Sequence, residues 1–252
     1  MKFPNQYIQG DITKNFGISR KFYLTYLLIS KYRSYEGYSW ITIKKVLEFY
    51  GVPSYKRRTK AFDEVLDVLR YMINSGMILI EQKLDDVSFD AGIEIKICPE
   101  RFYPAKDFSK ITYEQFDAIL KASGEINIET VLMVFLYVLS YIGSGKPILT
   151  GTCTKQGQHL PMAFYRSINH MAEDLSISKP TIRQCFQVFT DGKLISPPLL
   201  IKAELDPEQK QKFLLSSRIP NIYVLNTDDA ESEIFGAINY ISKVYSKNSM
   251  KG

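Results

Sequence analysis

The hydrophobic residues between Ser167 and Ile195 follow a helical period twice, with a short break between the two runs. Apolar positions spaced i, i+3, i+4 and i+7 form one face of an amphipathic helix. The first run consists of Ile168, Met171, Ala172 and Leu175, and the second of Ile182, Cys185, Phe186 and Phe189. Ser178 is a suitable N-cap for the second helix, Pro180 fits its first turn, and Gly192 would end it. The pattern predicts two helices joined by a tight turn at Ile177, then a strand that starts at Leu194 and Ile195.

The same pattern occurs 125 residues earlier in the chain. The first stripe is repeated by Ile43, Val46, Leu47 and Tyr50, and Val52 takes the place of Ile177 in the turn. Ser54 is the expected cap of the second helix, whose stripe consists of Phe62, Val65 or Leu66, Leu69 and Ile73. Gly76 would end this helix, which is longer than its counterpart because Gly51 and Gly76 are 25 residues apart and Ser176 and Gly192 only 16.

Each copy is preceded by an apolar helix and followed by two strand-like runs. The helices are "RKFYLTYLLISKY" and "IETVLMVFLYVLSYI". The strands are "MILIEQK" and "GIEIKIC" in the first copy, and "KLISPPLLIKAEL" and "IPNIYVLN" in the second, separated by the polar tips "LDDVSFDA" and "DPEQKQKFLLSSR". Three helices followed by a β-hairpin make a winged helix-turn-helix. We therefore predict a mostly α fold with small β-hairpin wings (α+β), formed by two tandem winged helix-turn-helix domains.

The expected domains are residues 1–98 and 111–252, joined by a linker at 99–110. The linker "PERFYPAKDFSK" has the proline and charge content of a connecting segment. A long loop at 144–162 separates the first two helices of the second copy. The last helix, at 233–245, carries an apolar stripe of Ile234, Phe235, Ile238, Ile241 and Val244 or Tyr245. We expect this stripe to fold back on its own domain, with a homodimer contact as the alternative.

Composition excludes several classes of protein. The most apolar segment, Val131–Ile142, has twelve residues, too few to span a bilayer. No apolar run near residue 1 suits a signal peptide, and three dispersed cysteines form no disulfide framework. These features predict a cytoplasmic protein without a membrane partner.

Enzyme chemistry finds little support in the sequence. "GSGKP" at 143–147 fails the phosphate-loop pattern, because Ser140 stands where a glycine is needed and Pro147 follows the lysine. Cys153 and His159 lack zinc spacing. We expect no enzyme activity, no cofactor and no metal, and we expect Trp40, the single tryptophan, to be a packing residue.

Charge is unevenly distributed along the chain. The formal net charge is +5; residues 1–110 contain 18 Lys and Arg against 13 Asp and Glu, whereas residues 111–252 contain 14 of each. The densest basic cluster, "YKRRTK" at 55–60, falls at the start of the second helix of the first copy. Cations at a helix N-terminus oppose the helix dipole, and bound phosphates would offset that cost.

The second helix of a helix-turn-helix enters the major groove, where its first residues reach base edges. We therefore predict that the chain binds double-stranded DNA. The predicted contacts are Ser54, Tyr55, Lys56, Arg57, Arg58 and Lys60 in the first copy, and Ser178, Lys179, Thr181, Arg183, Gln184 and Gln187 in the second. The alternative is that these residues are only the polar faces of surface helices.

The two copies, "YSWITIKKVLEFYGVPSYKRRTKAFDEVLDVLRYMINSGMI" and "SINHMAEDLSISKPTIRQCFQVFTDGKLI", resemble the tandem winged-helix replication initiators and replisome organisers of plasmids and phages from low-GC Gram-positive bacteria. The resemblance covers most of residues 18–226 and is one of architecture; the loop at 144–162 has no counterpart in it. It implies binding to origin repeats and recruitment of host replication proteins. A transcriptional regulator and a protein-interaction module that binds no DNA remain alternatives, because fold alone does not choose among them.

Overall fold

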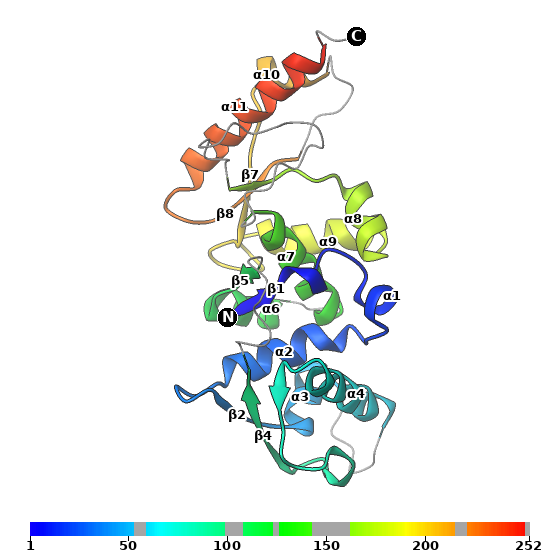
Figure 1. Cartoon of the computed structure of the whole chain (residues 1–252). Helices are drawn as coiled ribbons and strands as arrows, with labels where there is room; N and C mark the ends of the chain where they lie inside the picture. Colours follow the sequence, from blue (N-terminus) through cyan, green and yellow to red (C-terminus); the bar gives the residue numbers. More distant parts are fainter. Residues whose placement is uncertain (53–58, 99–107, 123–125, 143–161, 215–220, 250–252) are drawn as a thin grey trace. The chain divides into compact units, whose positions relative to one another are not determined.

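The computed structural model describes the chain except residues 53–58, 99–107, 123–125, 143–161, 215–220 and 250–252 (Figure 1). It is mostly helical, with small antiparallel sheets of two or three strands. The chain forms two compact units, residues 1–137 and 138–252, and the division falls within helix α7 (Ile128–Ile142). Of the helices in the described part, none combines the length and the apolar character needed to cross a bilayer.

The first unit contains a two-stranded sheet, a three-stranded sheet and the helices around them. Its elements in chain order are β1 (Lys2–Pro4), the 3-10 helix η1 (Asn5–Tyr7), α1 (Ile12–Phe16), α2 (Lys21–Lys31), β2 (Tyr38–Thr42), α3 (Ile43–Phe49), α4 (Lys60–Asn74), β3 (Ile78–Leu79), the 3-10 helix η2 (Leu84–Asp86), β4 (Gly92–Ile97), β5 (Phe108–Lys110), α6 (Tyr113–Ala122) and the start of α7. The larger sheet has the order β2-β4-β3, so the strand before α3 pairs with the last strand of the repeat, as Figure 1 shows for β2 and β4.

The core of the first unit forms around α2, which is buried on nearly all sides. The fully buried ring of Phe3, on β1, packs against Phe22 at 5.8 Å and Tyr26 at 5.1 Å between ring centroids. The Tyr23 hydroxyl donates to the Tyr7 carbonyl at 2.8 Å, so its buried polar end has a partner. Burial of this aromatic surface stabilises the unit.

The second unit begins with the end of α7 and continues through β6 (Ala163–Phe164), α8 (Ile168–Leu175), α9 (Lys179–Thr190), β7 (Leu200–Lys202), α10 (Pro207–Leu214), β8 (Tyr223–Leu225) and α11 (Ala230–Ser249). Its sheet has the order β6-β8-β7. The elements from α2 to β4 and from α7 to β8 therefore share the order helix–strand–helix–helix–strand–strand, apart from α10 between the last two strands of the second set, and in both the first strand pairs with the third. The 125-residue repeat predicted from the sequence corresponds to α3 and α8, which begin at Ile43 and Ile168.

Several predicted boundaries differ from the structure. Helix α4 begins at Lys60 and is capped by Thr59, not by Ser54. The prediction of a strand at Leu194 and Ile195 is wrong: these residues lie in a turn, and β7 begins at Leu200.

The polar segment expected to connect the last two strands of the second copy contains helix α10. Of the expected linker, residues 99–107 lie outside the described residues and Phe108–Lys110 form β5, which pairs with β1. The loop at 144–162 also falls almost entirely outside the described residues.

The terminal helix α11 packs on its own unit, as expected. Ala237, Ile238 and Ile241 are buried in a cluster with residues of the sheet, among them Val224. Phe235 was expected in this stripe, but its side chain is 71% exposed. At roughly 100° per residue, Phe235 points more than about 100° away from the mean direction of the three buried residues, so its side chain lies outside the cluster.

Candidate nucleic-acid interface

The helix pair α8–α9 is fixed by three serines. Ser167 caps α8, its Oγ accepting from the backbone N–H of His170 at 3.2 Å. Ser176 ends α8 in the left-handed conformation (φ 51°) and lets the chain reverse within two residues. Ser178 caps α9, accepting from the Thr181 N–H at 3.3 Å, and its hydroxyl lies 2.7 Å from that of Thr181. The first turn of α9 is therefore held in place by its cap.

The inward face of α9 packs as its apolar stripe predicted. Ile182, Cys185, Phe186 and Phe189 are all buried. The Phe186 ring lies 6.0 Å from that of Phe164 on β6 and stacks at 4.4 Å on that of Tyr223 on β8. This packing sets the rotation of α9 about its axis, and thus the direction in which its polar residues point.

The outward face of α9 carries polar side chains, most of which are exposed. Ser178, Lys179, Arg183, Gln184 and Gln187 are exposed, and Thr181 is partly buried. Lys179, Arg183 and Gln187 follow one another at i+4 and so lie along one ridge. No described residue forms a hydrogen bond or ion pair with the side chains of Lys179, Arg183, Gln184 or Gln187. Guanidinium and amide groups that are exposed and not already bonded within the protein can bond to base edges and phosphates.

The helix pair α3–α4 of the first unit is built differently. Thr42 caps α3, accepting from the Lys45 N–H at 3.0 Å, and Gly51 takes the left-handed conformation (φ 66°) at the position equivalent to Ser176. Thr59 caps α4, accepting from the Phe62 N–H at 3.3 Å. Of the residues predicted to contact DNA here, Ser54, Tyr55, Lys56, Arg57 and Arg58 lie outside the described residues. Lys60 is the first residue of α4.

Carboxylates accompany the cations of α4. Lys60 Nζ lies 3.9 Å from a Glu64 oxygen, and the Arg70 guanidinium bonds Asp85 at 2.6 Å and Asp67 at 2.7 Å. The bonds to Asp85 and Asp67 raise the pKa of Arg70, so this group stays charged and paired. Cations on α3 are also matched, because Lys44 pairs with Asp90 at 3.2 Å. These pairings join residues that are distant in the chain or depend on side-chain conformation, so the sequence alone does not predict them.

A buried charged network fixes α4 within its unit. Lys21 Nζ lies 2.8 Å from Glu129 and 3.5 Å from Glu64, and it stands 4.3 Å from the centre of the Tyr50 ring. The side chains of Lys21 and Glu129 are only 13% and 10% exposed. The Tyr50 hydroxyl donates to the Lys21 carbonyl, and burial raises the pKa of this tyrosine well above its ordinary value. The network joins α2, α4, α7 and the residue that ends α3.

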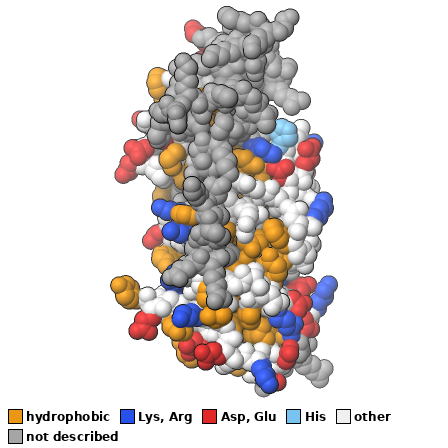
Figure 2. All heavy atoms as spheres, viewed as in Figure 1, with side chains coloured by type: hydrophobic (Ala, Val, Ile, Leu, Met, Phe, Trp, Pro, Cys, Tyr) orange, Lys and Arg blue, Asp and Glu red, His pale blue; other side chains and the backbone are white. Residues whose placement is uncertain are grey.

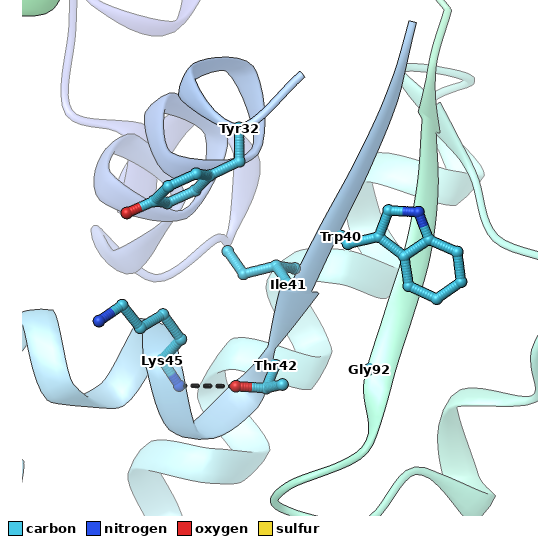
Figure 3. A pocket seen from close by; sticks show the side chains of 6 residues that line it. All are labelled: Tyr32, Trp40, Ile41, Thr42, Lys45 and Gly92. Atoms are coloured by element: carbon cyan, nitrogen blue, oxygen red, sulfur yellow. Dashed lines mark hydrogen bonds between the residues drawn. The ribbon is translucent and has the colours of Figure 1, made fainter. Parts of the chain in front are cut away.

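Trp40 is not a packing residue, contrary to the expectation from the sequence. Its side chain is 64% exposed because it occupies the outward position of β2, whose residues alternate between the two faces of the sheet. Its ring lies beside Gly92 on β4, and a cavity of about 340 Å³ adjoins it (Figure 3). Figure 3 shows Tyr32 and Lys45 on the other side of β2 from the indole, with Ile41 between them. The alternation in "YSWIT" could have indicated this exposure.

No metal site was found within the described residues: nowhere do three or more His, Cys, Asp or Glu side chains come together. Cys153 and His159 lie outside them. Cys185 is buried on the inward face of α9, and burial raises the pKa of its thiol to about 12, so it stays protonated near neutral pH.

On the face in Figure 2, the Lys and Arg side chains of the described residues are intermixed with Asp and Glu. Searches with family models and with the sequences of curated proteins found no match to this chain. The unsatisfied polar face of α9 is therefore the best-defined candidate for an interface.

Proposed function

We propose that this chain is a sequence-specific double-stranded DNA-binding protein made of two winged helix-turn-helix domains. The shared order of elements supports this, since α3–α4 and α8–α9 occupy the place of the helix-turn-helix and β3–β4 and β7–β8 that of the wings. The observation that carries the proposal is the outward face of α9, where two cations and two amides lie exposed without partners in the described chain.

In this proposal α9 is the helix that reads the major groove. Its N-terminal residues would lie nearest the bases. Arg183 is suited to the two acceptors of guanine, and Gln184 and Gln187 to the donor–acceptor pair of adenine. Ser178, Lys179 and Thr181, at the start of the helix, are suited to phosphates, which a helix N-terminus attracts.

The first unit would supply electrostatic attraction more than base recognition. The basic residues from Lys56 to Lys60 precede or open α4, whereas the body of that helix carries Asp63, Glu64 and Asp67 on or near its surface. Carboxylates on the groove-facing side of a helix would be repelled by phosphates. Tyr55 and Ser54 stay in the proposal as phosphate contacts.

The biological setting that we propose is replication initiation on a plasmid or phage, where the protein would bind origin repeats and recruit host replication proteins. This setting rests on the resemblance described above. Self-association through α11 is part of the proposal, with Phe235 as its exposed apolar contact. Transcriptional regulation is the alternative that uses the same DNA contacts.

The experiment is a selection of bound fragments by the full-length protein, from a random duplex library and from plasmid and phage DNA. We expect one enriched sequence, repeated within an origin, and loss of the enrichment with Arg183→Ala plus Gln184→Ala. Arg70→Ala, which removes a paired cation from α4, is the control and should leave the enriched sequence unchanged. Absence of enrichment from both libraries would contradict the proposal. Enrichment of promoters instead of origins would favour the transcriptional alternative.

A further inference from the structure

The outer face of the β2-β4-β3 sheet carries an exposed tryptophan. Burial alternates along these strands, so that Ser39 and Ile41 face the core. The outer face consists of Tyr38, Trp40, Thr42, Leu79, Gly92, Glu94 and Lys96. Trp40 and Leu79 are 64% and 44% exposed. Aromatic side chains contribute most to stability when they are buried, and an exposed tryptophan beside a cavity is typical of a binding surface.

The sheet holds the indole of Trp40 in a defined position. This residue lies in the middle of β2, directly opposite Glu94 in the antiparallel register. On the neighbouring strand Gly92 has no side chain to cover the ring, and a Cβ there would lie 3.6 Å from it. Strand β2 is at the edge of the sheet, and the cavity of about 340 Å³ is lined on both sides of this strand, by the indole on one and by Tyr32 and Lys45 on the other (Figure 3). The indole is therefore open to a planar ligand.

Charged side chains surround the indole. Lys96, whose ammonium lies 5.5 Å from the centre of the Tyr38 ring, forms no ion pair with a described residue. Lys45 belongs to an ion pair whose side chains are about half exposed, and such pairs contribute little to stability. Glu94 can accept a hydrogen bond from the edge of a base. Protein interface cores are depleted in lysine and glutamate, whereas surfaces that bind single-stranded nucleic acids combine aromatic rings with cations. The composition of this face therefore favours a nucleic acid over a protein.

A single strand suits these features better than a duplex. Stacking on an aromatic side chain requires an unpaired base, and the bases within a duplex are already stacked on one another. We propose that this face of the sheet binds single-stranded nucleic acid, with one base stacked on Trp40 and the adjoining phosphates contacted by Lys96 and Lys45. This binding goes beyond the recognition of duplex DNA by α9 and does not depend on it.

The test uses the full-length protein, labelled single strands of about twelve thymidylates or uridylates, and a random-sequence duplex. Because Trp40 is the single tryptophan, we expect a bound single strand to quench the fluorescence of the protein. Trp40→Ala should weaken single-strand binding, measured by fluorescence anisotropy, by about 10-fold or more, which corresponds to the loss of one stacked base. Lys96→Gln should lower the slope of log affinity against log salt by about 0.7.

Tyr35→Ala is the matched control. Tyr35 is fully exposed and lies in the turn before β2, outside the sheet, so its removal should change affinity by less than about twofold. Tighter binding of thymidylates or of uridylates would identify DNA or RNA as the ligand, and equal binding would assign the site to single strands of both kinds.

Three outcomes would overturn the proposal. Unchanged tryptophan fluorescence, or equal single-strand affinities of Trp40→Ala and the unsubstituted protein, would mean that no base stacks on the indole, and a protein partner would then be favoured for this face. Equal losses of Trp40→Ala on the single strand and on the duplex would mean that the contact is not to an unpaired base. Recognition by α9 is measured with Arg183 and Gln184 variants on a selected duplex, so its failure would be seen separately.

Discussion

Helices α4 and α9 occupy the same place in the two units but carry opposite surface chemistry. On α4 the cations Lys60 and Arg70 each lie against carboxylates. On α9 neither Lys179 nor Arg183 has a partner in the described chain. Residues 1–110, which hold the excess of positive charge in the sequence, thus contain the more neutralised helix, and residues 111–252, where charge is balanced, contain the helix whose polar groups are left unbonded.

This difference shows that a count of charges does not locate an interface. Side chains that already bond each other must exchange those bonds for new ones on binding, and the net gain is small. Side chains that are hydrogen-bonded only to water lose no bond to another protein side chain when they bind DNA. We therefore expect base recognition from the second unit and long-range attraction from the first.

The largest effect is expected in the buried charged network around Lys21 in the first unit. Lys21→Met leaves the buried Glu129 without its cation and Glu64 with Lys60 alone, and we expect the free energy of unfolding to fall by about 3 kcal/mol. Trp40, the single tryptophan, lies in this unit, so its fluorescence during urea unfolding reports the change.

Two further variants show whether that loss comes from an unpaired buried charge. The double variant Lys21→Met plus Glu129→Leu should recover most of the stability. Lys45→Met breaks a pair with Glu48 whose side chains are 50% and 41% exposed, and it should cost less than about 0.5 kcal/mol. A double variant as unstable as Lys21→Met alone would show that the network stabilises through packing.

The next effect concerns the salt dependence of DNA binding. Replacing Lys56, Arg57, Arg58 and Lys60 together by Ala should lower the slope of log affinity against log salt by roughly 3.6, if the four cations neutralise four phosphates. At low salt this corresponds to a loss on the order of 100-fold on any duplex. Lys60→Ala alone should lower the slope by less than about 0.9, because Glu64 partly neutralises this lysine.

An unchanged slope in the quadruple variant would remove the first unit from the DNA interface. Filter binding at several salt concentrations, with Arg70→Ala as the control, gives the measurement. Arg70 is held by two carboxylates, so its removal should leave the slope as it is in the unsubstituted protein.

A smaller and more selective effect is expected on α9. Arg183→Ala or Gln184→Ala should each cost about 1–3 kcal/mol on the selected sequence and much less on random DNA. Competition binding with the two duplexes measures both values. Equal losses on both would make these residues phosphate contacts, and the proposed division between the units would then be wrong.

The features that the sequence predicted well depend on residues close together in the chain. Helix α9, its cap at Ser178 and its buried stripe follow from the local period and capping chemistry. The turn was also foreseen, since Gly51 and Ser176 fall at equivalent positions of the repeat and both take the left-handed conformation.

Features that depend on distant residues could not be predicted in this way. Strand β2 exists because it pairs with β4, about 50 residues later, and β1 pairs with β5 more than 100 residues away. The contact of Lys21 with Glu129 is equally remote. The cap of α4 was misplaced because Ser54 and Thr59 are both good capping residues, and the period of the stripe does not fix where a helix begins.

The last comparison concerns the two turns and the smallest effect. Gly51 and Ser176 have φ of 66° and 51°, a region that costs a residue with a Cβ about 1 kcal/mol or more relative to glycine. A Cβ at Gly51 would meet no atom within 4 Å, so only the backbone would resist Gly51→Ala. We expect that variant to lower the free energy of unfolding by about 1 kcal/mol.

At position 176 the comparison is between Ser176→Gly and Ser176→Ala, which both remove the hydroxyl and differ only in the Cβ. The glycine variant should be the more stable by about the same amount. Urea unfolding followed by circular dichroism gives both differences, and Trp40 fluorescence reports the first unit separately. If glycine is favoured at 51 but not at 176, the two turns are not equivalent, and the repeat ends at the first helix of each pair.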